Sequence, residues 1–252
     1  MSTTDGPIWV VPSVSFGNVP QLVADLLLNN CEVSGPTAID APFVLPFLGS
    51  TQGTFDGVAT ALDVSKSADD RLLLFQQRAP VRSNCNRKQA EFLLALPQEV
   101  APKPSLIVLM HSVHAAYRLD ADLYVSEEGP CNPSAGVVTN ALFDQLADSS
   151  PLSLSGLTVL PTEKALQDSS FPHALLQVGT ASGIPVVVLV YFSNGGGIPE
   201  SFQLFFLLFS MLKGQLPLQS IQSPLAASSS QSVDPALTNS ITLQRPTSWA
   251  PY

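Results

Sequence analysis

The sequence predicts an α/β fold, namely a single three-layer α/β/α domain with a mostly parallel central sheet. Two continuous apolar runs, at 105–112 and 184–192, are typical of parallel strands buried on both faces. Apolar segments with helical character, at 19–30 and 199–213, provide helices to cover such a sheet. A chain of 252 residues, 45% of them hydrophobic, can bury one large core.

We expect this domain to occupy residues 1–218. Residues 219–252 are rich in Ser, Pro and Gln, which predicts a flexible tail. Two large aromatic residues, Trp249 and Tyr252, lie at the end of that tail. Side chains of this size favour contact with a surface, so both are candidate partner-binding residues.

The first strand is expected over residues 8–14, where β-branched and aromatic side chains dominate. Pro12 within it suggests an edge strand or a bulge, because proline cannot donate to a sheet ladder. A helix should follow over residues 19–30, with an apolar stripe that packs on the sheet. That stripe consists of Leu22, Val23, Leu26 and Leu27.

The turn between this strand and helix carries Gly17, Asn18 and Pro20. Asn18 stands where a helix N-cap belongs, and Pro20 falls in the first turn, where a missing N–H is tolerated. A phosphate-binding turn is the alternative, but the segment lacks the repeated glycines and the lysine of the known phosphate loops. The pattern therefore favours a structural turn.

The middle of the chain is less regular. The run at 105–112 should be a central strand, whereas residues 121–160 give no readable pattern. The other elements expected here are one or two short strands within 37–49, a strand at 57–64, a strand at 71–79 and a helix at about 86–97.

The final helix, over about 199–213, has clear boundary signals and an unusual composition. Pro199 and Glu200 suit its first turn, Lys213 its last turn, and Gly214 its end. Because the helix is apolar nearly all round, we expect burial on every side, partly by another chain. Its candidate partner-binding residues are Phe202, Phe205, Phe206 and Phe209.

Composition excludes several classes of function. The net charge is −9, and no basic stripe is present, so nucleic acid is not an expected ligand. Charged residues make up only 12% of the chain, which favours a protein partner that covers uncharged surface. The apolar runs are too short to span a bilayer, and the N-terminal segment lacks the basic start of a signal peptide. The three widely spaced cysteines indicate reduced thiols, so we expect an intracellular protein.

The strand at 105–112 delivers His111, Ser112 and His114 at its carboxyl end, where α/β enzymes place catalytic groups. A hydrolase or phosphorylase-like enzyme with a site around Ser112 and His114 is therefore one hypothesis. A G-x-S-x-G elbow is absent, because GTASG at 179–183 has its serine one position too late. Polar capping of the strand end is the simpler interpretation, and no third ligand completes a metal site with the two histidines.

The segment SNGGGIP at 193–199 precedes the final helix. Its backbone amides could attract an anion, which would make the protein a small-molecule-binding domain. Glu200 already provides negative charge in the first helical turn, so a plain turn is favoured over an anion site.

Several segments, in order, resemble the proteasome assembly chaperone family. PSVSFGNVPQLVADLLL at 12–28 is similar to the family's opening pattern P-x-x-S-x-GNVGQLAxDLL, with Pro20 in place of the usual glycine. LIVLMHSVHAAYRLDADL at 106–123 resembles its strand and loop of the type VIVLSSxHxxxRxDxQL, with Ser112, His114, Arg118 and Asp120 in place. Weaker matches are FVLPFLGS at 43–50, RLLLFQQRAPV at 71–81, VLVYFSNGGGIPESFQL at 188–204 and PTSW at 246–249.

The resemblance implies a three-layer α/β/α fold and a non-catalytic chaperone without a cofactor. It implies a heterodimer with proteasome assembly chaperone 1 that helps α-subunits of the 20S core particle to form the α-ring. It also implies a cytoplasmic location, with the nucleus as a second compartment. Some such chaperones carry a C-terminal hydrophobic–Tyr–X motif that inserts between α-subunits, whereas here Tyr252 is the last residue.

Overall fold

The computed structural model describes residues 6–51, 57–118, 134–146, 150–166, 170–195 and 197–212. The predicted tail, with Trp249 and Tyr252, lies outside the described residues, as do Asp120, Lys213, Gly214 and the boundary at residue 218. Within the described residues, no helix is both long and apolar enough to cross a bilayer.

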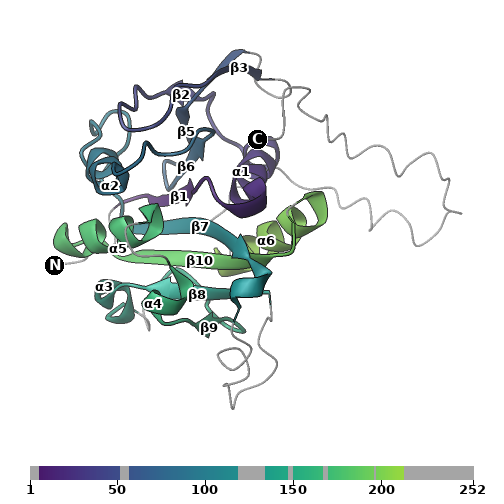
Figure 1. The fold of residues 1–252 in the computed structure, drawn as a ribbon. Helices are drawn as coiled ribbons and strands as arrows, with labels where there is room; N and C mark the ends of the chain where they lie inside the picture. Colours follow the sequence, from purple (N-terminus) through teal and green to yellow (C-terminus); the bar gives the residue numbers. More distant parts are fainter. Residues whose placement is uncertain are drawn as a thin grey trace, which may run out of the picture.

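An eight-stranded mixed sheet forms the middle layer, in the order β2-β5-β6-β1-β7-β10-β8-β9 (Figure 1). Its four central strands, β6, β1, β7 and β10, run parallel to one another, as the apolar runs predict. The fold class expected from the sequence is therefore confirmed. The strands are β1 (Ile8–Pro12), β2 (Thr37–Ala38), β5 (Leu62–Lys66), β6 (Leu72–Gln77), β7 (Leu106–His114), β8 (Ala135–Thr139), β9 (Thr158–Val159) and β10 (Val186–Ser193).

Helices cover both faces of this sheet. One face packs against α1 (Val19–Asn30) and α6 (Ile198–Met211), which lie side by side and enclose one buried apolar cluster. The other face packs against α2 (Asn86–Leu94) and α5 (Phe171–Ala181), which enclose a second cluster. The short helices α3 (Ala141–Asp144) and α4 (Thr162–Ala165) each add one residue to these cores, Phe143 and Ala165 respectively.

Pro12 does not mark an edge strand. β1 lies between β6 and β7, and it pairs with both. Pro12 is the last residue of the strand, and Ser13 directly after it donates its backbone N–H to Met110 O at 2.9 Å. A proline at the end of a central strand removes no hydrogen bond that the ladder needs, so the expectation of an edge or bulge was wrong.

The turn after β1 is structural, but Asn18 does not cap α1 with its side chain. Gly17 has φ 69° and Asn18 has φ 54°, both in the left-handed region, and the N-cap makes no side-chain hydrogen bond to the helix. Asn is one of the few residues apart from Gly that enter this region readily. Asn18 therefore contributes its backbone conformation, and the predicted cap was wrong. Pro20 lies in the first turn as expected.

Residues 57–64 do not form one strand. The chain forms β4 (Gly57–Thr60), bends at Ala61, and continues as β5 in the main sheet. β4 pairs instead with β3 (Leu48–Thr51) in a separate two-stranded sheet. The alternation of apolar residues runs through the bend, so the pattern alone could not reveal the change of sheet.

The remaining expectations differ from the structure mainly at the ends of elements. α2 ends at Leu94, before the predicted stop at Pro97, and β7 continues to His114. The helix α5 was not predicted, although Ser170 caps it by accepting from the N–H of His173 at 3.4 Å. Pro172 in its first turn was a second available signal.

Candidate functional site

Ser112 is held inside the fold rather than offered to a substrate. Its side chain is on β7, next to β1, and the residue is 1% exposed. Its hydroxyl donates to the backbone oxygen of Phe16 and lies 2.9 Å from the hydroxyl of Ser15. The turn after β1 is thus tied across the end of β7, at the point where α/β enzymes usually open a crevice.

His114 does not act on Ser112. Its Nδ1 accepts the backbone N–H of Ala116 at 3.0 Å, which caps the short helix at Ala115–Tyr117. Its ring contacts that of Phe16 edge-on, with centroids 4.8 Å apart. A nucleophile and its base must share a hydrogen bond, whereas these two side chains bond to different backbone groups. Capping of the strand end, the simpler expectation, fits this arrangement.

His111 points to the other face of β7 and contacts Ser13, with 2.8 Å between Nδ1 and the serine hydroxyl. Burial lowers the pKa of His111 to about 4, so the imidazole is neutral at physiological pH. Among the described residues, no group of three or more His, Cys, Asp and Glu side chains is arranged to hold a metal ion.

The turn before α6 carries its own anion. Glu200 Oε1 accepts the backbone N–H of Asn194 at 2.9 Å, and the hydroxyl of Ser193 donates to Oε2. A carboxylate of the same chain therefore takes up donors of the turn that a bound anion would need. This geometry agrees with the plain turn favoured by the sequence.

The outer face of α6 is the most apolar exposed surface of any helix in the described part of the chain. Phe206 is 62% exposed and Phe209 is 38% exposed, while Phe202 is half-buried and stacks on Phe206 with centroids 6.5 Å apart. We call these three residues the α6 outer face. Phe205 differs from them, because it is 6% exposed and belongs to the core under α1 and α6.

This chain alone therefore does not bury α6 on every side, and burial of the remaining face by another chain, which the sequence analysis also expected, stays a prediction. The opposite helix layer carries charged residues on its exposed surface. The side chains of Arg87 and Glu91 on α2 are exposed and form an ion pair at 2.9 Å. In contrast, α1 and α6 contain no basic residue and one acidic residue each, Asp25 and Glu200. The α6 outer face is thus suited to contact with another protein.

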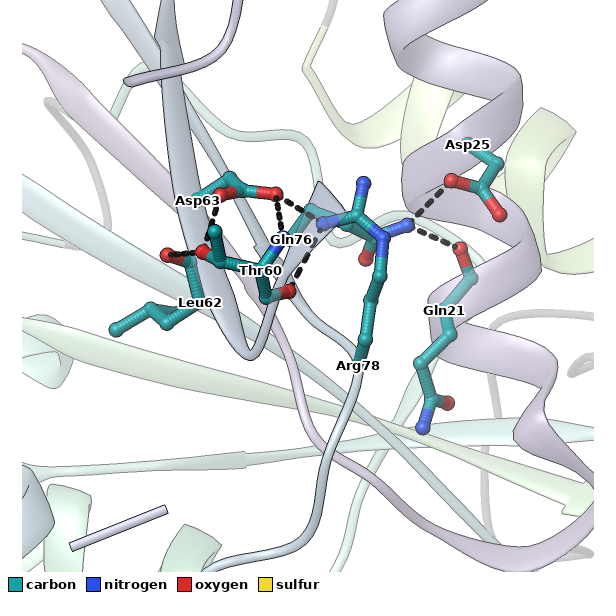
Figure 2. A network of polar contacts seen from close by, with 7 residues as sticks. All are labelled: Gln21, Asp25, Thr60, Leu62, Asp63, Gln76 and Arg78. Carbon is teal, nitrogen blue, oxygen red and sulfur yellow. Dashed lines mark hydrogen bonds and ion pairs between the residues drawn. The ribbon is translucent and has the colours of Figure 1, made fainter. Parts of the chain in front are cut away.

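A buried polar network joins β5, β6 and α1 (Figure 2). The side chain of Asp63 on β5 is 3% exposed and forms an ion pair with Nη1 of Arg78. The Thr60 hydroxyl lies 2.6 Å from Asp63 Oδ1, and its backbone N–H donates to Oδ2 at 3.3 Å. The Asp63 carboxylate is therefore fully paired inside the protein.

The second part of the network joins β6 to α1. Nε2 of Gln76 donates both to Oδ1 of Asp25 and to the backbone oxygen of Gln21, the latter at 3.1 Å (Figure 2). Burial raises the pKa of Asp25, while the hydrogen bond from Gln76 and the positive charge of Arg78 only partly oppose the shift. Asp25 is thus a carboxylate whose charged form the fold disfavours.

Asp25→Asn is expected to raise the stability of the folded chain near pH 7. The folded state binds the Asp25 proton more tightly than the unfolded state does, because the pKa of Asp25 is raised above 3.8 on folding. The stability of the wild type therefore falls as the pH rises from 3.8 through the pKa of the folded state. Asn keeps an acceptor for Gln76 but carries no charge. The gain should be largest near pH 7 and vanish below about pH 4. Thermal unfolding across this pH range tests the expectation, and a lower midpoint of the variant near pH 7 would contradict it.

Comparison with known sequences finds one matching family and one similar protein. The sequence profile of the PAC2 family matches residues 9–199. A protein of Nematostella vectensis named proteasome assembly chaperone 2 is 28% identical over 145 residues, which cover 55% of this chain and 59% of that protein. The chain thus matches less than two thirds of the length of this relative.

Solved structures show the same fold at low sequence identity. Pyrococcus furiosus PbaA, an archaeal homolog of proteasome-assembly chaperone, has a TM-score of 0.55 at 12% identity, covering 88% of this chain and 86% of its own. Pyrococcus furiosus PbaB, an archaeal proteasome activator, has a TM-score of 0.54 at 16% identity, covering 84% of each chain. A Thermoplasma acidophilum protein of unknown function has a TM-score of 0.57 at 10% identity, covering 82% of this chain and 76% of its own.

Proposed function

Because this chain belongs to the PAC2 family, we propose that it is a non-catalytic chaperone that promotes assembly of the 20S proteasome. It acts as a heterodimer with proteasome assembly chaperone 1 and helps α-subunits to join into the α-ring. Similarity to a proteasome assembly chaperone of another organism supports this role. The proposed site of action is the cytoplasm, with the nucleus as a second compartment.

The observation that carries the proposal is the contrast between two surfaces. The strand end, which an enzyme would use, is closed by the chain's own hydrogen bonds from Ser112 to Phe16 and Ser15. The α6 outer face exposes aromatic rings, and none of its three residues carries a charge. A protein that works by binding needs such a surface and needs no open catalytic pocket. We assign the heterodimer contact to the α6 outer face, and the tail residues Trp249 and Tyr252 remain candidates for contact with partners.

Affinity purification of the tagged chain from its native cells tests the function directly. We expect proteasome assembly chaperone 1 and free α-subunits to remain bound through gentle washing and to be identified by mass spectrometry. Recovery of the chain with neither protein would contradict the proposal. Ser112→Ala provides the comparison with the enzyme alternative, because it removes the hydroxyl around which that alternative places its site. A chaperone should recover the same partners with this variant as with wild type.

A further inference from the structure

Three aromatic rings at the carboxyl end of β7 contact one another and reach the surface. The centroid of the His114 ring is 4.8 Å from that of Phe16 and 6.4 Å from that of Tyr117. Tyr117 is 70% exposed and Phe16 is 39% exposed. We call these three residues the strand-end ring cluster. Exposed apolar side chains are ordinary when they are scattered singly, whereas a group of them in contact indicates a binding surface.

Hydrogen bonds hold two of these rings in place. The hydroxyl of Ser112 donates to the backbone oxygen of Phe16, and Nδ1 of His114 accepts the backbone N–H of Ala116. A surface whose side chains are already fixed loses little conformational entropy when a partner binds. The bonds that close the enzyme-like strand end therefore also prepare it as a surface for contact.

The strand-end ring cluster lies next to the first turn of α6. His114 pairs with Ser193, the last residue of β10, in the parallel ladder. Glu200, in the first turn of α6, accepts hydrogen bonds from the hydroxyl of Ser193 and from the backbone N–H of Asn194. The start of α6 is thus fixed to the residue that stands beside His114.

The cluster and the α6 outer face also lie on the same side of the sheet. His114 alternates along β7 with Met110, which belongs to the core under α1 and α6. On α6, Ile198, Phe202 and Phe206 follow one another at intervals of four residues, so they share one side of the helix. Ile198 is 41% exposed, and it stands at the end of α6 that lies next to the cluster.

The area of the α6 outer face indicates that a partner needs more surface than this helix offers. A fully covered aromatic side chain buries about 150–250 Å². The three rings of the α6 outer face are only partly exposed, so together they offer less than the roughly 800 Å² per partner of a standard interface. The strand-end ring cluster provides further aromatic surface, of the kind that is enriched in protein interfaces.

We propose that the partner chaperone seated on the α6 outer face extends past Ile198 and covers the strand-end ring cluster, with Tyr117 as its main contact there. The inference rests on the proposed function, because it enlarges the contact made by the same partner. It also gives a role to the strand-end residues Ser112 and His114, which hold or form a part of the binding surface rather than a catalytic site.

The test is the affinity of Tyr117→Ala for purified proteasome assembly chaperone 1, measured by isothermal titration calorimetry beside wild type. We expect Tyr117→Ala to weaken binding about tenfold, whereas Tyr117→Phe, which keeps the ring, should stay within about threefold of wild type. The matched control is Leu48→Ala, which should bind within about twofold of wild type. Leu48 is 79% exposed, but it lies on β3 in the separate two-stranded sheet. Because Tyr117 is 70% exposed, the unfolding midpoint of Tyr117→Ala should match that of wild type.

The outcomes separate this inference from the proposed function. Wild-type affinity in Tyr117→Ala would overturn the inference and leave the proposed function intact. If Tyr117→Ala instead loses only the α-subunits in affinity purification from cells, the cluster has a different occupant and the inference is wrong. An equal loss in Leu48→Ala would also contradict it, because the effect would not be specific to this surface. Failure of the wild-type chain to bind the partner would overturn both proposals.

Discussion

Replacing Arg78 with methionine is expected to lower the free energy of unfolding by about 3–5 kcal/mol. The Asp63 side chain is 3% exposed, and Arg78 is the cation that pairs with it. Methionine preserves most of the apolar stem of arginine, so the variant removes the charge and its hydrogen bonds with little change in packing. A buried carboxylate without a cation remains, and this unpaired charge is the source of the large loss. Urea or guanidinium unfolding at neutral pH measures it.

The chain offers a matched control in Arg87, whose ion pair with Glu91 is exposed to solvent. Arg87→Met should cost less than about 1 kcal/mol, because exposed pairs contribute little. The double variant Arg78→Met with Asp63→Asn should recover part of the loss, since it removes the stranded charge as well. A loss from Arg78→Met no greater than that from Arg87→Met would show that Asp63 does not depend on this partner.

The central sheet could be predicted because its signal is local. The runs that form β7 and β10 are apolar without interruption, and α1 and α6 are marked by spacing and by proline in their first turns. The bend at Ala61 could not be found in this way, since β4 and β5 continue one alternating pattern although they belong to different sheets. The role of Asn18 was misjudged for a related reason: sequence shows which residue stands at a helix start but not its backbone angles.

The candidate surface was predictable only in part. The number of phenylalanines in α6 indicated a candidate contact surface. Composition cannot show which ring faces the core, whereas the structure shows that Phe205 is buried and Phe206 is exposed. The network of Asp25, Gln76 and Arg78 left no sequence signal at all. Its members come from α1, β6 and the segment after β6, and they meet only because the parallel pairing of β6 with β1 brings those segments together.

Phe206→Ala is expected to weaken binding of proteasome assembly chaperone 1 by about 30-fold, or 2 kcal/mol, with the stability of the free chain changed by less than about 0.5 kcal/mol. Phe206 is 62% exposed, so its ring contributes little to the fold, whereas a large aromatic side chain at the centre of a protein contact can act as a hot spot. Calorimetric titration gives the affinity, and chemical unfolding of the free chain gives the stability.

The neighbouring residue makes this test specific to the surface. Phe205→Ala truncates the same kind of side chain one position earlier, but that ring is 6% exposed and lies in the core under α1 and α6. Its loss should cost about 3–5 kcal/mol of stability through the cavity it leaves. The two variants are therefore expected to show opposite profiles, with binding lost in one and folding weakened in the other. If Phe206→Ala binds with wild-type affinity, the α6 outer face is not part of the heterodimer contact. Phe206 has the largest exposed fraction of the described aromatic side chains on this helix, so such a contact would have to involve it.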